Sequence, residues 1–194
     1  MRRNSVRVIA GTLRRRLIHF PDLPDLRPTP DRVRVTLFNW LGQDLTGMIC
    51  LDLFAGSGAL GFEAASRGAR HVVMVERETA VVRSLQEMAQ QLASPTVEIV
   101  RDDALQFLHR SRAQFNVVFL DPPYRAHLLG ELLPRLPPHL HDDALVYAEN
   151  RGRIALPHKW RVVRESRAGR VNYLLLQYQR DEHPSDSSDL PRNL

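Results

Sequence analysis

The chain has 194 residues, of which 43% are hydrophobic and 25% charged, and its formal net charge is +5 at pH 7. This composition excludes a chain that is disordered throughout. No apolar run approaches the roughly 18 residues of a membrane span, and none follows the basic start of the chain, so we expect neither a signal peptide nor an anchor. Cys50 is the only cysteine. A disulfide within the chain and a cysteine-based zinc site are therefore excluded, and we expect a cytoplasmic protein.

The basic residues are unusual in type and in placement. Lys159 is the only lysine, so all but one of the 27 basic residues are arginine, which binds phosphate bidentately and stacks on bases. Arginines are dense in the first 34 positions, where only Asp22, Asp25 and Asp31 oppose them. This pattern favours contact with nucleic acid, with a solvated basic segment as the alternative. The candidate contacts are Arg7, Arg14, Arg15, Arg16, Arg27, Arg32 and Arg34.

The first 46 residues predict a small basic extension. Residues 5–10 alternate polar and apolar side chains, a turn is possible at Gly11, and residues 13–20 continue the mixture, which favours a hairpin. Four prolines between positions 21 and 30 then exclude regular structure. A helix is expected to start near Asp31, with Arg32 and Arg34 on faces other than its apolar one.

Strands and helices alternate from residue 47 to residue 180. Strands are predicted at residues 48–54, 71–75, 97–100, 115–120 and 144–148, with a closing hairpin over 160–165 and 171–179. Helices are predicted at residues 59–67, 78–92, 104–110 and 128–136. This order predicts an α/β fold with a parallel sheet covered on both faces. Residues 181–194, rich in Ser, Asp and Pro, are predicted to form a disordered tail.

A glycine-rich turn joins the first strand and helix of this region. Gly56 and Gly58 permit positive φ and close approach of a ligand, and Gly61 permits tight packing of the helix on a strand. The glycines alone suit either a nicotinamide dinucleotide or S-adenosylmethionine. Asp52, at the end of an apolar strand, suits a ligand with a cationic amine and sulfonium and therefore favours S-adenosylmethionine.

Acidic residues follow the next two strands. Glu76 ends the second strand and is predicted to accept hydrogen bonds from both ribose hydroxyls of the cofactor. Asp103 follows the third strand and serves as a helix N-cap, as an acceptor for the adenine amino group, or as both. Asp102 is the alternative for either role. The predicted cofactor-binding residues are Asp52, Phe54, Gly56, Gly58, Gly61, Glu76, Asp103 and Ala104.

The most specific motif is Asp121-Pro122-Pro123-Tyr124, which follows the strand at residues 115–120. The two prolines remove two backbone donors, so the Asp121 carboxylate and the Pro122 carbonyl face the sheet edge as acceptors. Two acceptors beside an aromatic ring suit an exocyclic amino group on a planar base, against which Tyr124 stacks. These four residues are the predicted catalytic group. The histidines lack the context of metal ligands, so no metal is expected.

These motifs together resemble those of class I S-adenosylmethionine-dependent methyltransferases that modify exocyclic amines. Three N-terminal blocks, at residues 7–11, 27–34 and 37–39, are similar to the RsmD family of 16S ribosomal RNA guanine-N(2)-methyltransferases, and the resemblance covers residues 5–180. The family commonly has glycine where Arg15 stands, glutamate where Val35 stands and often phenylalanine at Tyr124.

The resemblance implies a Rossmann-like fold with a seven-stranded, mostly parallel sheet and a C-terminal antiparallel hairpin. The methyltransferase domain is expected at residues 47–180, preceded by an RNA-binding hairpin and helix in residues 1–46. The implied reaction is methyl transfer to the 2-amino group of one guanine in 16S ribosomal RNA. The implied substrate is an assembled or partly assembled small subunit, and a monomer with no membrane or metal partner is expected.

Three alternatives remain at this point. A methyltransferase acting on the adenine 6-amino group of DNA or RNA uses the same Pro-Pro-Tyr loop, and only the block at residues 27–34 argues against it. A nicotinamide-dependent dehydrogenase shares the glycines but has no use for residues 121–124. A non-catalytic RNA-binding protein would keep the arginines without an intact cofactor motif.

Overall fold

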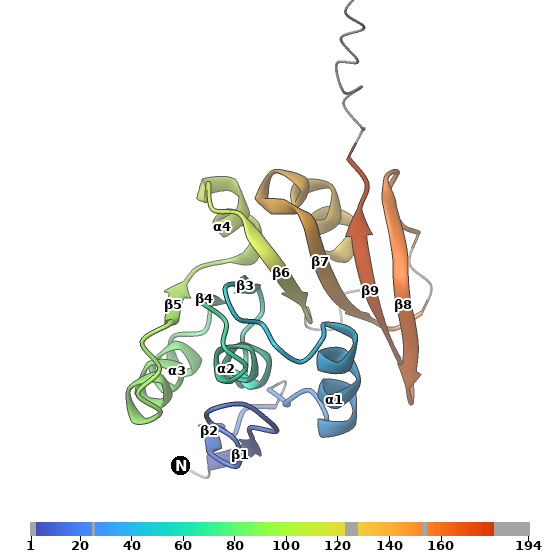
Figure 1. Ribbon diagram of the computed structural model, residues 1–194. Helices are drawn as coiled ribbons and strands as arrows, with labels where there is room; N and C mark the ends of the chain where they lie inside the picture. The colour runs from blue at the N-terminus through green and yellow to red at the C-terminus, as the bar shows by residue number, and fades with distance from the viewer. Residues whose placement is uncertain (1–2, 25, 123–127, 153–154, 181–194) are drawn as a thin grey trace, which may run out of the picture.

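The computed structural model describes residues 3–24, 26–122, 128–152 and 155–180. Seven strands form its main sheet: β3 (Ile49–Asp52), β4 (His71–Glu76), β5 (Val97–Arg101), β6 (Phe115–Leu120), β7 (Leu140–Asn150), β8 (Trp160–Ala168) and β9 (Val171–Tyr178). Their order is β5-β4-β3-β6-β7-β9-β8 (Figure 1). The strands β3 to β7 are parallel, whereas β9 runs antiparallel to β7 and β8. The predicted sheet and its closing hairpin are thus confirmed.

Helices cover both faces of this sheet. One face packs against α1 (Asp31–Trp40), α2 (Ala59–Ser66) and α3 (Thr79–Gln91), and the other against α4 (Ala104–Arg110) and α5 (Leu128–Leu132). Two 3₁₀ turns, η1 (Leu133–Arg135) and η2 (Pro137–His139), follow α5. The single helix predicted at residues 128–136 is therefore wrong in length, because Pro134 cannot continue an α-helical hydrogen-bond ladder. No helix in the described part of the chain is long and apolar enough to span a membrane.

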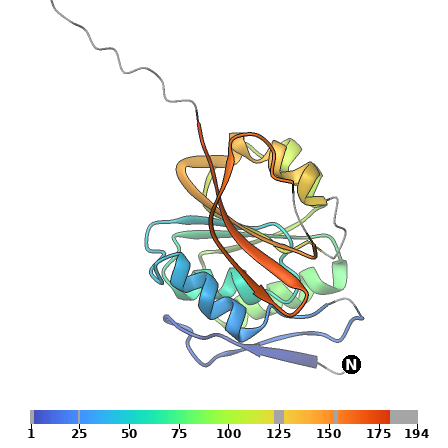
Figure 2. The same cartoon turned by 90° about the vertical axis from the view of Figure 1, so that its right-hand side faces the viewer.

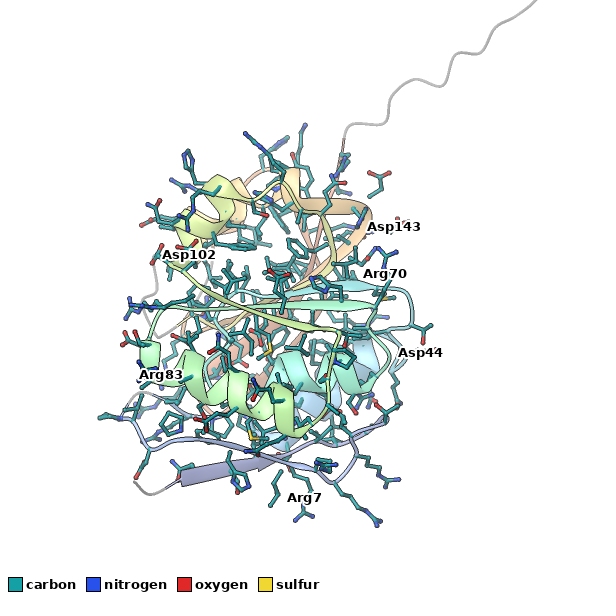
Figure 3. The ribbon with its side chains drawn as sticks, turned by 90° about the vertical axis from the view of Figure 1, so that its left-hand side faces the viewer. Arg7, Asp44, Arg70, Arg83, Asp102 and Asp143 are labelled. Carbon is teal, nitrogen blue, oxygen red and sulfur yellow. The ribbon has the colours of Figure 1, made fainter. Side chains whose placement is uncertain are left out.

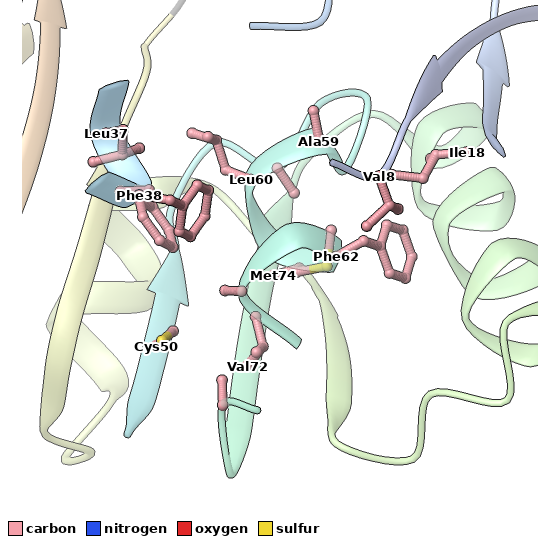
Figure 4. Close-up of a cluster of buried hydrophobic side chains, with 14 of the residues drawn as sticks. Val8, Ile18, Leu37, Phe38, Cys50, Ala59, Leu60, Phe62, Val72 and Met74 are labelled. Atoms are coloured by element: carbon pink, nitrogen blue, oxygen red, sulfur yellow. The ribbon is translucent and has the colours of Figure 1, made fainter. Parts of the chain in front are cut away.

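The N-terminal strands β1 (Arg3–Arg7) and β2 (Leu17–Pro21) form an antiparallel hairpin, as predicted. In Figure 2 this hairpin is a layer outside the helices. Its apolar side chains lie in the same hydrophobic cluster as those of α2 and β4, as Val8 and Ile18 beside Phe62 show in Figure 4. The hairpin is therefore packed into the main core, while a domain boundary at residue 46 stays a prediction. The tail predicted at residues 181–194 lies outside the described residues.

A buried carboxylate holds the hairpin to α2. Glu63 accepts hydrogen bonds from the backbone N–H groups of Ile9, at 2.8 Å, and Ala10, at 3.0 Å. It also pairs with Arg34 at 3.3 Å and with Arg67 at 2.9 Å. All the side-chain charges involved are shielded from solvent, so salt screens these contacts little, and Glu63 has two cationic partners.

Arg34 links this cluster to the start of α1. Its guanidinium donates to the carbonyl oxygens of Thr29, at 3.2 Å, and Arg7, at 2.9 Å, and to the Asp31 carboxylate at 2.6 Å. The side chain is 0% exposed. The prediction that Arg34 contacts RNA from an exposed face is therefore wrong: the residue lies one helical turn before Phe38, on the buried face of α1.

The parallel strands define two opposite edges of the sheet. The parallel strands end at what we call the carboxyl edge, and the opposite one is the amino edge. Because β8 runs in the same direction as β7, the β8–β9 turn also lies at the carboxyl edge. Figure 3 shows the separation: Asp102, which follows β5, lies on one side of the molecule, and Arg70, which precedes β4, lies on the other.

Candidate functional site

Acidic side chains gather at the carboxyl edge. Asp52 and Glu76 end β3 and β4, Asp121 directly follows β6, and Glu149 is the second-last residue of β7. The pairing of Leu120 with Ala148 places Asp121 beside Glu149 on neighbouring strands. Both lie two residues after side chains packed under α1 and α2, so both project toward that face. Among the described residues no group of three or more His, Cys, Asp or Glu side chains could hold a metal ion.

The glycine-rich turn has the geometry expected of it. Gly56 has φ 48° and Gly58, the N-cap of α2, has φ 81°, both in the left-handed region. A Cβ on Gly61 would come within 2.7 Å of the Met74 sulfur. The packing argument for Gly61 is therefore confirmed: α2 lies directly on β4 because this helical position has no side chain.

Asp52 lies underneath this turn. One of its oxygens accepts the Gly61 N–H at 3.0 Å, and the Phe54 N–H also hydrogen bonds to the carboxylate. Burial raises the pKa of Asp52 to about 7, the two N–H groups oppose the shift, and the Glu76 charge adds to it. The side chain thus supports the turn from within, and its direct contact with a ligand stays a prediction.

Glu76 is oriented by the backbone around it. Its Oε2 accepts the Gly56 N–H at 3.1 Å, and its Oε1 accepts those of Arg77 at 2.8 Å and Glu78 at 2.9 Å. A carboxylate offers about four acceptor positions. Glu76 can therefore accept one ligand hydroxyl in this arrangement, and a second one if the Gly56 N–H moves away.

The two acids after β5 have different surroundings. Asp103 is the N-cap of α4: its Oδ1 accepts the N–H groups of Leu105 at 2.9 Å and Gln106 at 3.4 Å. Asp102 accepts the Asp103 N–H at 2.8 Å through Oδ1 and pairs with Arg110 through Oδ2. Asp103 is exposed and keeps Oδ2 clear of these cap bonds, which favours Asp103 over Asp102 as a ligand acceptor.

Two further predicted cofactor contacts flank these acids. Ala104 is the first residue of α4 and is buried, whereas Phe54 is half-buried in the glycine-rich turn. Both positions lie at the carboxyl edge, and their contact with a cofactor stays a prediction.

A residue of the N-terminal segment, Thr29, contacts Asp121. Its Oδ2 accepts a hydrogen bond from the Thr29 hydroxyl at 3.3 Å, and Pro122 beside it is buried. Burial raises the pKa of Asp121 well above its usual value, and the charges of Glu149 and Asp52 raise it further. The predicted catalytic residues Pro123 and Tyr124 lie outside the described residues.

The structure adds Glu149 and Tyr147 to the site, and neither residue belongs to a predicted sequence motif. The Tyr147 hydroxyl donates to Glu149 Oε1 at 2.6 Å, and Glu149 is 7% exposed. Burial raises the pKa of Glu149, which the Tyr147 hydrogen bond opposes. A signal was present in the sequence, since Glu149 directly follows the apolar run at residues 144–148, just as Asp121 follows the run at residues 115–120. Only the pairing of β6 with β7 shows that the two carboxyl groups are neighbours.

The remaining predicted RNA contacts are exposed but lie in different places. The turn that carries Arg14, Arg15 and Arg16 contacts the last residues of α2 and α3, through Thr12 N–H to the Ser66 carbonyl at 2.8 Å and Arg16 to the Gln91 carbonyl at 3.2 Å. Both helices end at the amino edge, so this turn lies roughly 20 Å, the length of α3, from the acids. The other predicted RNA contacts that are exposed lie outside this turn, and they are Arg7, Arg27 and Arg32.

Comparison with known proteins identifies the family. The family described as Conserved hypothetical protein 95 matches residues 6–177. A relative in Escherichia coli named Ribosomal RNA small subunit methyltransferase D is 41% identical, over 95% of both chains. The chain belongs to the RsmD family of ribosomal RNA methyltransferases. A relative of the same name in Haemophilus influenzae is 39% identical over 90% of this chain and 95% of its own.

Solved structures similar to this RsmD-family chain agree with the fold. A candidate methyltransferase from Escherichia coli is 40% identical with a TM-score of 0.82, covering 91% of this chain and 99% of its own. A candidate methylase from Haemophilus influenzae is 37% identical with a TM-score of 0.77, covering 91% and 100%. The predicted family and enzyme class are thereby confirmed, and the dehydrogenase and non-catalytic alternatives are excluded.

Proposed function

We propose that the protein transfers a methyl group from S-adenosylmethionine to the 2-amino group of one guanine in 16S ribosomal RNA. Its substrate is the assembled or partly assembled small subunit, and it acts as a cytoplasmic monomer. The observation that carries the proposal is the pair of neighbouring carboxyl groups, Asp121 and Glu149, one strand from the glycine-rich turn. The name of the Escherichia coli relative supports the choice of ribosomal RNA of the small subunit.

The residues around the turn fit the cofactor. Glu76 is fixed by three backbone N–H groups and has an acceptor position for a ribose hydroxyl. Asp103 presents Oδ2 next to the start of α4, where an adenine amino group would be received. When bound, S-adenosylmethionine supplies a methyl group on a cationic sulfur, which the surrounding acids favour electrostatically.

The acceptor pair distinguishes guanine from adenine. The Watson–Crick edge of guanine presents two adjacent N–H donors, at N1 and at the 2-amino group. Adenine presents one amino group beside an acceptor nitrogen. When both are ionised, Asp121 and Glu149 offer two neighbouring acceptors, which match the guanine pattern and would leave one carboxylate facing the adenine N1 lone pair. The preference between these two bases therefore rests on Glu149 as much as on Asp121.

The contribution of the chain to the reaction is positioning and exclusion of water. Asp121, held by the Thr29 hydroxyl, and Glu149, held by the Tyr147 hydroxyl, orient the amino nitrogen toward the methyl group. Bound S-adenosylmethionine would supply the methyl group to the oriented nitrogen and would leave as the neutral thioether. The proton released from the amino nitrogen passes to one of these carboxylates or to water.

Methyl transfer from labelled S-adenosylmethionine to small ribosomal subunits that lack methylation, and in parallel to free 16S RNA, tests the proposal. We expect the label at the 2-amino group of a single guanine in 16S RNA. Label on an adenine would contradict the base assignment, and label restricted to free RNA would contradict the assignment of the assembled subunit as substrate.

A further inference from the structure

The β8–β9 turn carries two arginines at the edge of the sheet where the acids lie. Asn172 in β9 pairs with Asn150 at the end of β7 on one side and with Arg167 on the other. Arg170 follows in the turn itself. Two strand spacings separate Arg167 from Asn150, so their backbones are roughly 10 Å apart. The backbones of Arg167 and Arg170 therefore lie near that of Glu149, although more than 40 positions separate them from Asp121 in the sequence. The register places the Arg167 side chain on the sheet face opposite that of Glu149, so Arg167 can reach a ligand at this edge only around the end of the strand.

The turn is held in place and its charges face solvent. Asn172 Nδ2 donates to the Gly152 carbonyl at 2.8 Å, which ties β9 to the segment after β7. Arg167 Nε donates to the Gly169 carbonyl at 2.8 Å, so its guanidinium stays at the turn. Both arginines are exposed, and no acidic residue in the described part of the chain pairs with either.

The first turn of α1 lies at the same edge. Thr29, just before this helix, bonds to Asp121, and the exposed Arg32 is the second helical residue. The rings of Trp40 and Tyr173 lie 5.4 Å apart and hold α1 against β9. In Figures 1 and 2 the tip of the β8–β9 hairpin lies beside α1. Exposed arginines from two separate elements thus lie at the same edge of the sheet as the acidic site.

We propose that Arg167 and Arg170 bind phosphate groups of the RNA that flank the target base. The proposal rests on the proposed function, since it assumes an RNA substrate. A carboxylate-lined site repels a phosphate backbone, and cations at its border that hold the neighbouring phosphates offset this repulsion when a base enters. The β8–β9 turn supplies such cations at the required edge, whereas the Arg14–Arg16 turn lies at the opposite one.

An edge strand also carries charged side chains to prevent pairing with another sheet. If this were the only role of the two arginines, their removal would change self-association and would leave RNA binding unchanged. Phosphate binding instead predicts weaker substrate binding with a reduced salt dependence, because each lost phosphate contact removes about 0.7–0.9 from the slope of log affinity against log salt concentration.

The test compares two double variants with the same change in charge. Arg167→Ala with Arg170→Ala removes the turn charges. Arg70→Ala with Arg161→Ala removes two exposed arginines at the amino edge, where Figure 3 shows Arg70. For the first variant we expect about tenfold weaker binding of small ribosomal subunits near 0.15 M salt and a slope reduced by about 1.5. Its affinity for S-adenosylmethionine should equal that of the wild type, and the control should keep the wild-type slope.

The outcomes separate this inference from the proposed function. Equal slopes for the turn variant and the wild type, or a turn variant that only self-associates, would overturn the phosphate assignment while wild-type methylation still supports the function. Recovery of most of the slope in Arg167→Lys with Arg170→Lys would support charge as the cause. A wild-type protein that binds S-adenosylmethionine but methylates no small-subunit RNA would overturn the proposed function instead.

Discussion

Replacing Arg34 with alanine is expected to destabilise the protein severely. The change removes hydrogen bonds to the Thr29 and Arg7 carbonyls and one of the two cations that neutralise buried Glu63. Breaking a buried ion pair from one side costs about 3–5 kcal/mol. Arg67 remains within 2.9 Å of Glu63 and limits that term, while two orphaned carbonyls add roughly 1–3 kcal/mol each. We therefore expect a loss of about 4 kcal/mol, a large share of the 5–15 kcal/mol typical of a folded domain.

Urea unfolding measures this loss directly. With a slope of about 2–3 kcal/mol per molar urea, the midpoint of Arg34→Ala should fall by roughly 1.5–2 M. Arg32→Ala is the matched control, because Arg32 is exposed on the same helix and its removal should change stability by no more than about 0.5 kcal/mol. An Arg34→Ala midpoint equal to that of the control, together with a weaker salt dependence of RNA binding, would refute the buried-clamp interpretation.

Four further predictions concern the site and the hairpin. Asp121→Ala should abolish methylation and leave cofactor affinity within about tenfold, since the proposed role of this side chain is to hold the base; an equal loss of cofactor binding would contradict that role. Glu76→Ala should cost roughly 1–3 kcal/mol of cofactor binding in calorimetry, and an unchanged affinity would place the ribose acceptor elsewhere. Arg15 has φ 70°, so Arg15→Gly should relieve about 1–2 kcal/mol of backbone strain, part of which the greater entropy of the unfolded glycine chain offsets. The urea midpoint should therefore rise for Arg15→Gly, whereas it should not rise for Arg15→Ala. Because the pKa of Asp52 is raised to about 7, the folded state holds a proton that the unfolded state releases near pH 4. Stability should therefore fall by about 2–3 kcal/mol from pH 5 to pH 8 relative to Asp52→Asn, and parallel pH profiles of the two proteins would contradict the shift.

Local patterns were sufficient to predict most elements of the fold. The helix at residues 104–110 and the strand at residues 115–120 have the predicted bounds. These bounds follow from the spacing of the apolar residues in each segment and from the polar residues that flank it. The glycine positions also followed from local chemistry: the positive φ of Gly56 and Gly58 and the contact of Gly61 with β4 need only a strand, a turn and a helix in succession. Asp121 was likewise predictable from its neighbours in the sequence, since it directly follows an apolar strand and precedes two prolines.

Partners distant in sequence decided the rest. Arg32 and Arg34 stand two positions apart in one basic block, yet one is exposed and the other is buried against Glu63, 29 positions away. Charge in the sequence does not show which cation has a buried partner. Likewise, Glu149 becomes the neighbour of Asp121 only through the pairing of β6 with β7. Arg167 and Arg170 reach the same edge only because β9 pairs antiparallel with both β7 and β8. Composition and motifs determined the chemistry of the site, whereas strand pairing decided which side chains surround it, because pairing joins segments that share no local pattern.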